Sequence, residues 1–203
     1  MDDQTKAAKR AAHTARCRGY EAEGYTVTDK TVSAFTGNLL GILIPLPATV
    51  LLYFAAASAA SHWFGPLERN FYVIPFFPLC MVLLFLHEVT HALFALPHCK
   101  NGRKSIHLGF NVEGLNPYCT CKEPLLLKHY RQVLLAPLFV EGLLVVVLGV
   151  CLASHTIILL GCLMFWSSGG DMLIYLLTLR FPHNTLVLDH PYLIGCTVLR
   201  KAV

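Results

Sequence analysis

The sequence predicts an all-α membrane protein with about four transmembrane helices and a cytoplasmic β-hairpin between helices two and three. Composition is the first observation, because 55% of the 203 residues are hydrophobic and only 14% are charged, against about 25% charged in soluble domains. The second is a set of four long apolar runs. The third is the clustering of basic residues between alternate runs. Together they indicate a chain whose solvent is largely lipid.

Each of the four apolar runs is long enough for a helix that crosses a bilayer, which takes about 20 residues. The backbone of an isolated strand would stay unsatisfied in lipid, so helices are the expected structure. A length of 203 residues favours one domain. The predicted spans are Leu39–Ala60, Tyr72–Leu96, Val133–Ala153 and Ile157–Leu179.

Basic residues predict the orientation. Fifteen of the 16 Lys and Arg residues lie before the first span, between the second and third, or after the fourth, and only Arg69 lies elsewhere. Because cytoplasmic loops carry the excess of Lys and Arg, four spans with both termini in the cytoplasm satisfy this rule.

Two segments outside the spans have predicted structures of their own. Residues 1–33 form a cytoplasmic N-terminal tail, and residues 34–203 the membrane-embedded domain. The tail is interpreted as a basic helix on the membrane surface or, the reading we favour, a solvated and partly disordered segment. In the loop from Pro97 to Arg131, "KSIHLGFNV" alternates as a strand and "PYCTCKE" can return beside it after a turn at 113–116, which predicts the hairpin.

The second span contains "LHEVTHALF", an H-E-x-x-H motif made by His87, Glu88 and His91. Residues four apart lie on one face of a helix, so both imidazoles can reach one Zn²⁺ ion. Zinc lowers the pKa of a bound water toward about 7, and the adjacent carboxylate can take its proton. The alternative is a polar cluster that pairs internally and binds no metal. Polar groups are costly in an apolar span, which favours the functional reading.

A catalytic zinc usually has a third protein ligand, and two intramembrane carboxylates are candidates. Asp171 lies in the fourth span and Glu141 in the third. At 1.5 Å per helical residue, both lie roughly 13–15 Å in from the cytoplasmic side, in one layer with the two histidines. We favour Asp171, because the small residues of "SSGG" before it let helices approach closely. Glu141 is either the ligand itself or a group that orients a histidine.

Other polar residues carry weaker predictions. A second, structural zinc site could be built from His98, Cys99, Cys119 and Cys121, although C-x-C is not a usual finger spacing. Asp189 and His190 precede a proline and are interpreted as turn formers. Pro137 predicts a kink or local unwinding in the third span.

The order of these features resembles a bacterial family of small multi-pass zincin-type peptidases. "HEVTH" in the second of four helices, a hairpin, and "SSGGD" in the last helix carry the resemblance, with "TVSAFTGNLLG", "KEPLLLKHYRQVLLAP" and "LDHPYLIG". It extends from about Thr26 to the C-terminus. It implies a zinc site in the bacterial cytoplasmic membrane, with Asp171 as the third ligand.

More distantly, the chain is similar to the site-2 proteases, which cut transmembrane segments of their substrates. Those enzymes carry H-E-x-x-H and a later Asp followed by Gly, whereas here Met172 follows Asp171 and the glycines precede it. The departure leaves the third ligand and the substrate class open.

The predicted function is a zinc metallopeptidase that acts on membrane-associated or transmembrane protein substrates, with Glu88 as general base. The expected partners are the lipid bilayer and a protein or peptide substrate. Two alternatives come from other classes: a membrane metal transporter, and a non-proteolytic scaffold with a metal site. The sequence has no Walker loop, no G-x-S-x-G elbow and no nucleic-acid-binding module.

Overall fold

A computed structural model describes residues 3–67, 73–111, 116–191 and 193–201. Within these residues, four helical segments are long and apolar enough to cross a membrane, as predicted. They cover Ala34–Phe64, Phe76–His98, Leu127–Cys151 and His155–Thr178. The predicted start of the second span and Arg69 lie outside the described residues. Which side of the membrane each end faces remains a prediction.

The first span consists of two helices, α2 (Ala34–Leu43) and α3 (Leu46–Phe64). Ser33 caps α2, because its side-chain oxygen accepts a hydrogen bond from the Thr36 amide at 3.1 Å. Pro45 stands at the start of α3, where its missing N–H costs least. The break therefore comes from a residue that a helix tolerates only in its first turn.

The second span is α4 (Val73–Ala95), which continues into the short 3₁₀ turn η1 (Leu96–His98). The third is made of α5 (Leu127–Pro137), the π-helical segment η3 (Leu138–Leu143) and α6 (Leu144–Cys151). The irregularity predicted at Pro137 is present, as a π-helix that begins directly after it. Such segments are frequent at functional sites, and this one carries Glu141.

The fourth span is also broken, into α7 (His155–Ser167) and α8 (Gly169–Thr178). The break at Ser168 places Asp171 in the first turn of α8. Gly169 lies so close to α2 that a Cβ there would overlap the carbonyl oxygen of Gly41. As predicted for this run of small residues, the absence of side chains lets two helices approach closely.

The fold is mostly helical, as predicted, but it is not all-α apart from the hairpin, because the chain also forms a four-stranded antiparallel sheet in the order β1-β6-β5-β4. Its long strands, β1 (Tyr25–Val32) and β6 (Ile194–Lys201), pair along their whole length. The short strands β5 (Leu186–Asp189) and β4 (Leu125–Leu126) complete it. The signal was missed because the strands are short or lie in segments read as tails.

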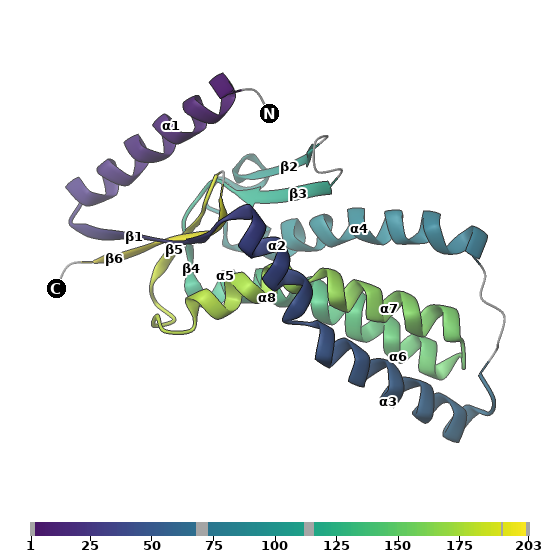
Figure 1. Cartoon of the computed structure of the whole chain (residues 1–203). Coiled ribbons are helices and arrows are strands. Elements are labelled where there is room, and N and C mark those ends of the chain that lie inside the picture. Colours follow the sequence, from purple (N-terminus) through teal and green to yellow (C-terminus); the bar gives the residue numbers. More distant parts are fainter. Residues whose placement is uncertain (1–2, 68–72, 112–115, 192, 202–203) are drawn as a thin grey trace.

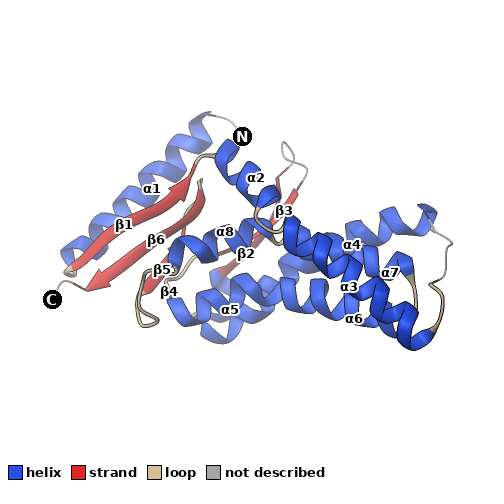
Figure 2. Ribbon diagram, turned by 60° about the horizontal axis from the view of Figure 1, so that its bottom comes forward, coloured by secondary structure: helices blue, strands red, loops and turns tan. Residues whose placement is uncertain are grey.

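The predicted hairpin is present between α4 and α5, as β2 (Ile106–Asn111) paired with β3 (Asn116–Cys121) after the turn η2 (Gly102–Ser105). Residues of the favoured disordered tail instead form α1 (Asp3–Ala22) and β1. Figures 1 and 2 show α1, the sheet, the hairpin and both termini together at one end of the helix bundle. An even number of spans returns the chain to the side on which it began, which is consistent with both termini lying at one end.

Buried and exposed apolar side chains separate clearly. One buried cluster, including Leu127 and Val198, joins the end of the bundle to the sheet, and another, including Ala60 and Ile158, lies between α3, α6 and α7. Many large apolar side chains on the helices stay exposed, among them Phe77 at 71% and Leu144 at 60%. Such an apolar outer surface is expected where lipid, rather than water, surrounds the bundle.

Candidate metal centre

The two histidines of the H-E-x-x-H motif lie one turn apart on α4. Both are buried, and their ring centroids are 4.9 Å apart. The surrounding sequence is a nearly continuous apolar run, so the helix forms throughout it and fixes the i, i+4 relation. The motif therefore presents two imidazoles in one direction, into the interior of the bundle.

Asp171 on α8 meets both rings with a single oxygen atom. Its Oδ2 lies 3.1 Å from Nε2 of His87 and 3.4 Å from Nε2 of His91. Two ligands of a tetrahedral zinc with bonds of about 2.0–2.1 Å stand about 3.3 Å apart. The three side chains form one of the two groups of potential metal ligands found among the described residues. Their spacing fits a zinc ion.

The hydrogen bond of His91 favours the tautomer that a metal needs. Its Nδ1 lies 2.9 Å from the carbonyl oxygen of Val133 on α5. A carbonyl can only accept, so Nδ1 carries a proton, and Nε2, which faces Asp171, is the nitrogen left to bind a metal. Metal-binding histidines usually donate their second N–H in this way.

His87 has an unused donor position next to an unused acceptor. Its Nδ1 and the Oε2 of Glu141 are both buried without a hydrogen-bond partner, yet they lie only 3.9 Å apart. The other carboxylate oxygen, Oε1, accepts from the Thr90 hydroxyl at 2.6 Å. An ion held at Nε2 of His87 would leave the proton on Nδ1, directed at Glu141. Glu141 thus stands behind His87, while Asp171 is the carboxylate among the candidate ligands.

Glu88 is half-buried on the same helix. Its carboxylate lies near both histidines, Asp171 and the backbone amide of Cys119 on β3. The hairpin strand β3 therefore runs alongside α4, next to the motif. Glu88 lies outside the group of potential metal ligands formed by His87, His91 and Asp171.

A pocket opens beside the centre, toward the sheet. Its polar lining consists of His91, Asp171, Tyr130, Asp189 and two cysteines of β3, Cys119 and Cys121. Apolar residues of α4, β4, α5 and α8 complete the wall. A pocket with a few convergent polar groups is the usual form of a small binding site.

Asp189 belongs to this pocket, which the reading of it as a turn former missed. It ends β5, accepts a hydrogen bond from the Tyr130 hydroxyl at 2.7 Å and another from the Cys121 amide at 2.8 Å. Burial raises the pKa of this carboxyl, against the effect of these two donors. Asp189 therefore ties the hairpin to the sheet at the edge of the pocket. The signal for it was the apolar run of "LVLD", which is too short to identify a strand.

The second zinc site considered for His98 and three cysteines is not formed in the described part of the chain. Only the thiols of Cys99 and Cys121 come together there, 3.4 Å apart. Burial raises the pKa of both Cys119 and Cys121 to about 12. Neutral thiols are poor metal ligands, since the thiolate is the binding form.

Comparison with known proteins agrees with the motif. A family model described as "Putative zincin peptidase" matches residues 80–186, more than half of the chain. The chain belongs to the zincin peptidase family. The match includes the H-E-x-x-H motif, the hairpin and Asp171, but it is narrower than the resemblance from Thr26 onward. Family membership indicates a zinc-dependent metallopeptidase. No curated protein matches the chain, and no solved structure does.

Proposed function

We propose that this protein is a zinc metallopeptidase whose active site lies inside the bilayer, near the cytoplasmic end of the helices. The observation that carries the proposal is the meeting of His87, His91 and Asp171, with ligand atoms all within 4.8 Å of one another. They come from two candidate membrane spans, and polar groups at that depth are retained for function. The location follows from the basic residues, which gather at the end that carries the sheet and hairpin.

In this proposal His87, His91 and Asp171 hold the metal, and Glu88 is the general base. Bound Zn²⁺ would polarise the scissile carbonyl and make water easier to deprotonate. Glu88 takes a proton from the attacking water and passes it to the leaving amine. The position of Glu88 beside the three ligand side chains supports this role.

The groups around the centre serve orientation. Val133 fixes the ring of His91 through its carbonyl oxygen, and Glu141, held by Thr90, stands behind His87. Such groups set ring direction and ligand basicity. Because they come from the third span, that span would keep both imidazoles aligned while substrates enter and leave.

The substrates we propose are membrane-associated or transmembrane segments that become extended at the hairpin. The amides of Cys119 and Cys121 lie two residues apart, so they point to the same edge of β3. One faces Glu88 and the other donates to Asp189, so this edge borders the pocket. Because the Cys121 amide is already engaged by Asp189, an extended peptide would add beside Cys119 by backbone hydrogen bonds and lie beside the metal. A helical segment must unwind before its peptide bond can reach the centre.

The test compares zinc content and proteolysis in wild type and Glu88→Gln, in detergent or lipid nanodiscs. We expect Glu88→Gln to keep its zinc and to lose cleavage by at least about 100-fold, as for general acid–base groups. Glu23→Gln, an exposed glutamate far from the centre, is the matched control and should cleave normally. Equal cleavage by Glu88→Gln would reject the mechanism.

The same variant separates the proposal from a metal transporter, which needs ligands more than a base. A Glu88→Gln protein that still moves zinc into liposomes, together with a wild type that cleaves no substrate, would favour transport. A scaffold with a degenerate site would purify without zinc, and neither Glu88→Gln nor Glu23→Gln would change its properties.

A further inference from the structure

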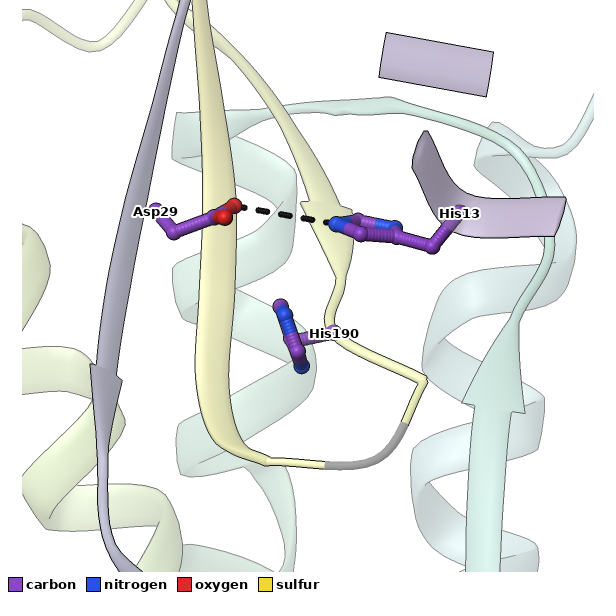
Figure 3. A group of neighbouring side chains, drawn as sticks. All are labelled: His13, Asp29 and His190. Atoms are coloured by element: carbon purple, nitrogen blue, oxygen red, sulfur yellow. Dashed lines mark ion pairs between the residues drawn. The ribbon is translucent and has the colours of Figure 1, made fainter. Parts of the chain in front are cut away.

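A second cluster of potential ligands lies outside the peptidase centre, in the part of the molecule made by α1 and the sheet. It consists of His13 on α1, Asp29 on β1 and His190 directly after β5. Figure 3 shows the three side chains converging from three separate elements. All three residues lie outside the residues matched by the family model. The peptidase centre makes no use of His13 or Asp29.

We propose that His13, Asp29 and His190 bind a divalent transition-metal ion, with Zn²⁺ as the natural probe, and that the ion fastens α1 to the sheet. Their ligand atoms all lie within 4.8 Å of one another. Two imidazoles with one carboxylate is a donor set that suits zinc and related ions, whereas calcium and magnesium prefer oxygen ligands.

Nε2 of His13 has hydrogen-bond partners in Thr197 and Cys17, and its distance to Asp29 is a little above the spacing of two zinc ligands. This atom lies 3.3 Å from Oγ1 of Thr197, 3.5 Å from Sγ of Cys17 and 3.7 Å from Oδ1 of Asp29. Ligands of one zinc ion stand about 3.3 Å apart. A small contraction of the cluster would therefore complete the site.

Burial and access are both suitable. His13 and His190 are buried, so a bound ion would be shielded from competing water. The Asp29 side chain is 48% exposed and gives the ion a path from solvent.

One contact opposes binding and limits the affinity. The Leu193 amide donates to Nδ1 of His190 at 3.0 Å, which places the proton of the neutral ring on Nε2. An ion at Nε2 would move that proton to Nδ1 and break the bond from Leu193. Occupancy should thus slow amide exchange in α1 while it speeds exchange at Leu193. These opposite changes are a signature that nonspecific binding would not produce.

The site would strengthen contacts that already join α1 to the sheet, among them that of His13 with Thr197 on β6. Besides its packing on β1, α1 donates from Arg16 to the carbonyl oxygen of Lys122 at 2.9 Å, directly after β3. An ion held by His13 would add a link to both β1 and the β5–β6 connection. The expected effect is a more firmly held α1.

The test counts zinc ions per chain in full-length protein by equilibrium dialysis and elemental analysis. Wild type should bind two ions, His13→Ala one, His91→Ala one, and the double variant none. His62→Ala, an exposed histidine on α3, is the control and should bind two. If only His91→Ala lowers the count, this proposal fails; if only His13→Ala does, the proposed peptidase centre fails instead.

A second readout covers the case in which a variant folds poorly. Hydrogen exchange of wild type, followed by mass spectrometry, should show protection of residues 7–19 on addition of Zn²⁺, and His190→Asn should lose that protection. Zinc that leaves exchange in α1 unchanged in a well-folded wild type would overturn the proposal.

Discussion

Gly169 at the start of α8 packs directly against the carbonyl oxygen of Gly41 on α2. This approach sets how far α8, and with it Asp171, reaches into the bundle. Gly169→Ala should force the helices apart, costing about 1–3 kcal/mol as overpacking does, and should weaken zinc binding. Thermal unfolding and zinc affinity measure both effects.

The neighbouring glycine supplies the control for this substitution. A Cβ at Gly170 would meet nothing within 4 Å, so Gly170→Ala should be neutral or stabilise by up to about 1 kcal/mol, the usual difference between the two residues in a helix. If both alanine variants behaved alike, the close approach of α2 and α8 would not be what positions Asp171.

The two carboxylates near the centre should respond differently to amide substitution. Asp171→Asn removes a ligand and should lower zinc affinity by more than about 100-fold, beyond the 10–100-fold typical of outer groups. Glu141→Gln should lower zinc affinity only within that 10–100-fold range, because it changes a neighbour of His87 and not a ligand. Competition with a fluorescent zinc chelator measures both. The opposite order would make Glu141 the ligand.

The features that the sequence predicts correctly are those set by residues close to one another in the chain. Apolar length predicted the four spans, and the i, i+4 spacing predicted that His87 and His91 share a face. Helical rise from the span ends placed Asp171 at the depth of the histidines. These features depend on local helix geometry, which the spacing of residues in the sequence determines.

The parts that were missed depend on contacts between distant segments. β1 and β6 pair across more than 160 residues, and β4 has only two residues, so neither leaves a recognisable pattern. The contact of Thr90 with Glu141 depends on how α4 and η3 are rotated. Asp189 reaches the pocket only because β5, which it ends, pairs with β4 and β6 in the sheet.

Glu123 makes the attachment of the hairpin sensitive to pH. Its carboxylate accepts from the Ser105 hydroxyl at 2.6 Å, from the Lys100 amide at 2.7 Å and from Asn101. The Ser105 hydroxyl, followed by the backbone amides, lowers the pKa of this carboxyl. The stabilisation is therefore present above about pH 4.5 and is lost as pH falls through the lowered pKa.

Glu123→Gln should consequently lower the thermal midpoint at pH 7. It should also narrow the difference between the thermal midpoints at pH 7 and pH 3. Thermal midpoints at the two pH values, with Glu21→Gln as an exposed control, measure this. An unchanged difference in Glu123→Gln would show that other groups determine the acid response.

The proposed substrate edge of β3 can be tested through one backbone amide. Cys119→Pro removes the N–H that faces Glu88, and because this amide shares its edge with that of Cys121, the pairing with β2 should persist. We expect weaker peptide binding, seen as a raised KM, in a protein that keeps its zinc. Cys119→Ala should bind peptide normally; if it is impaired equally, the side chain and not the amide matters.

X-ray absorption at the zinc edge tests the central claim most directly, using full-length His13→Ala so that only the peptidase centre is occupied. We expect nitrogen and oxygen neighbours at about 2.0–2.1 Å, with two imidazoles, and a changed spectrum when Asp171→Asn is added to this variant. Sulfur neighbours at about 2.3 Å, or a spectrum that is unchanged by Asp171→Asn, would contradict a centre formed by His87, His91 and Asp171.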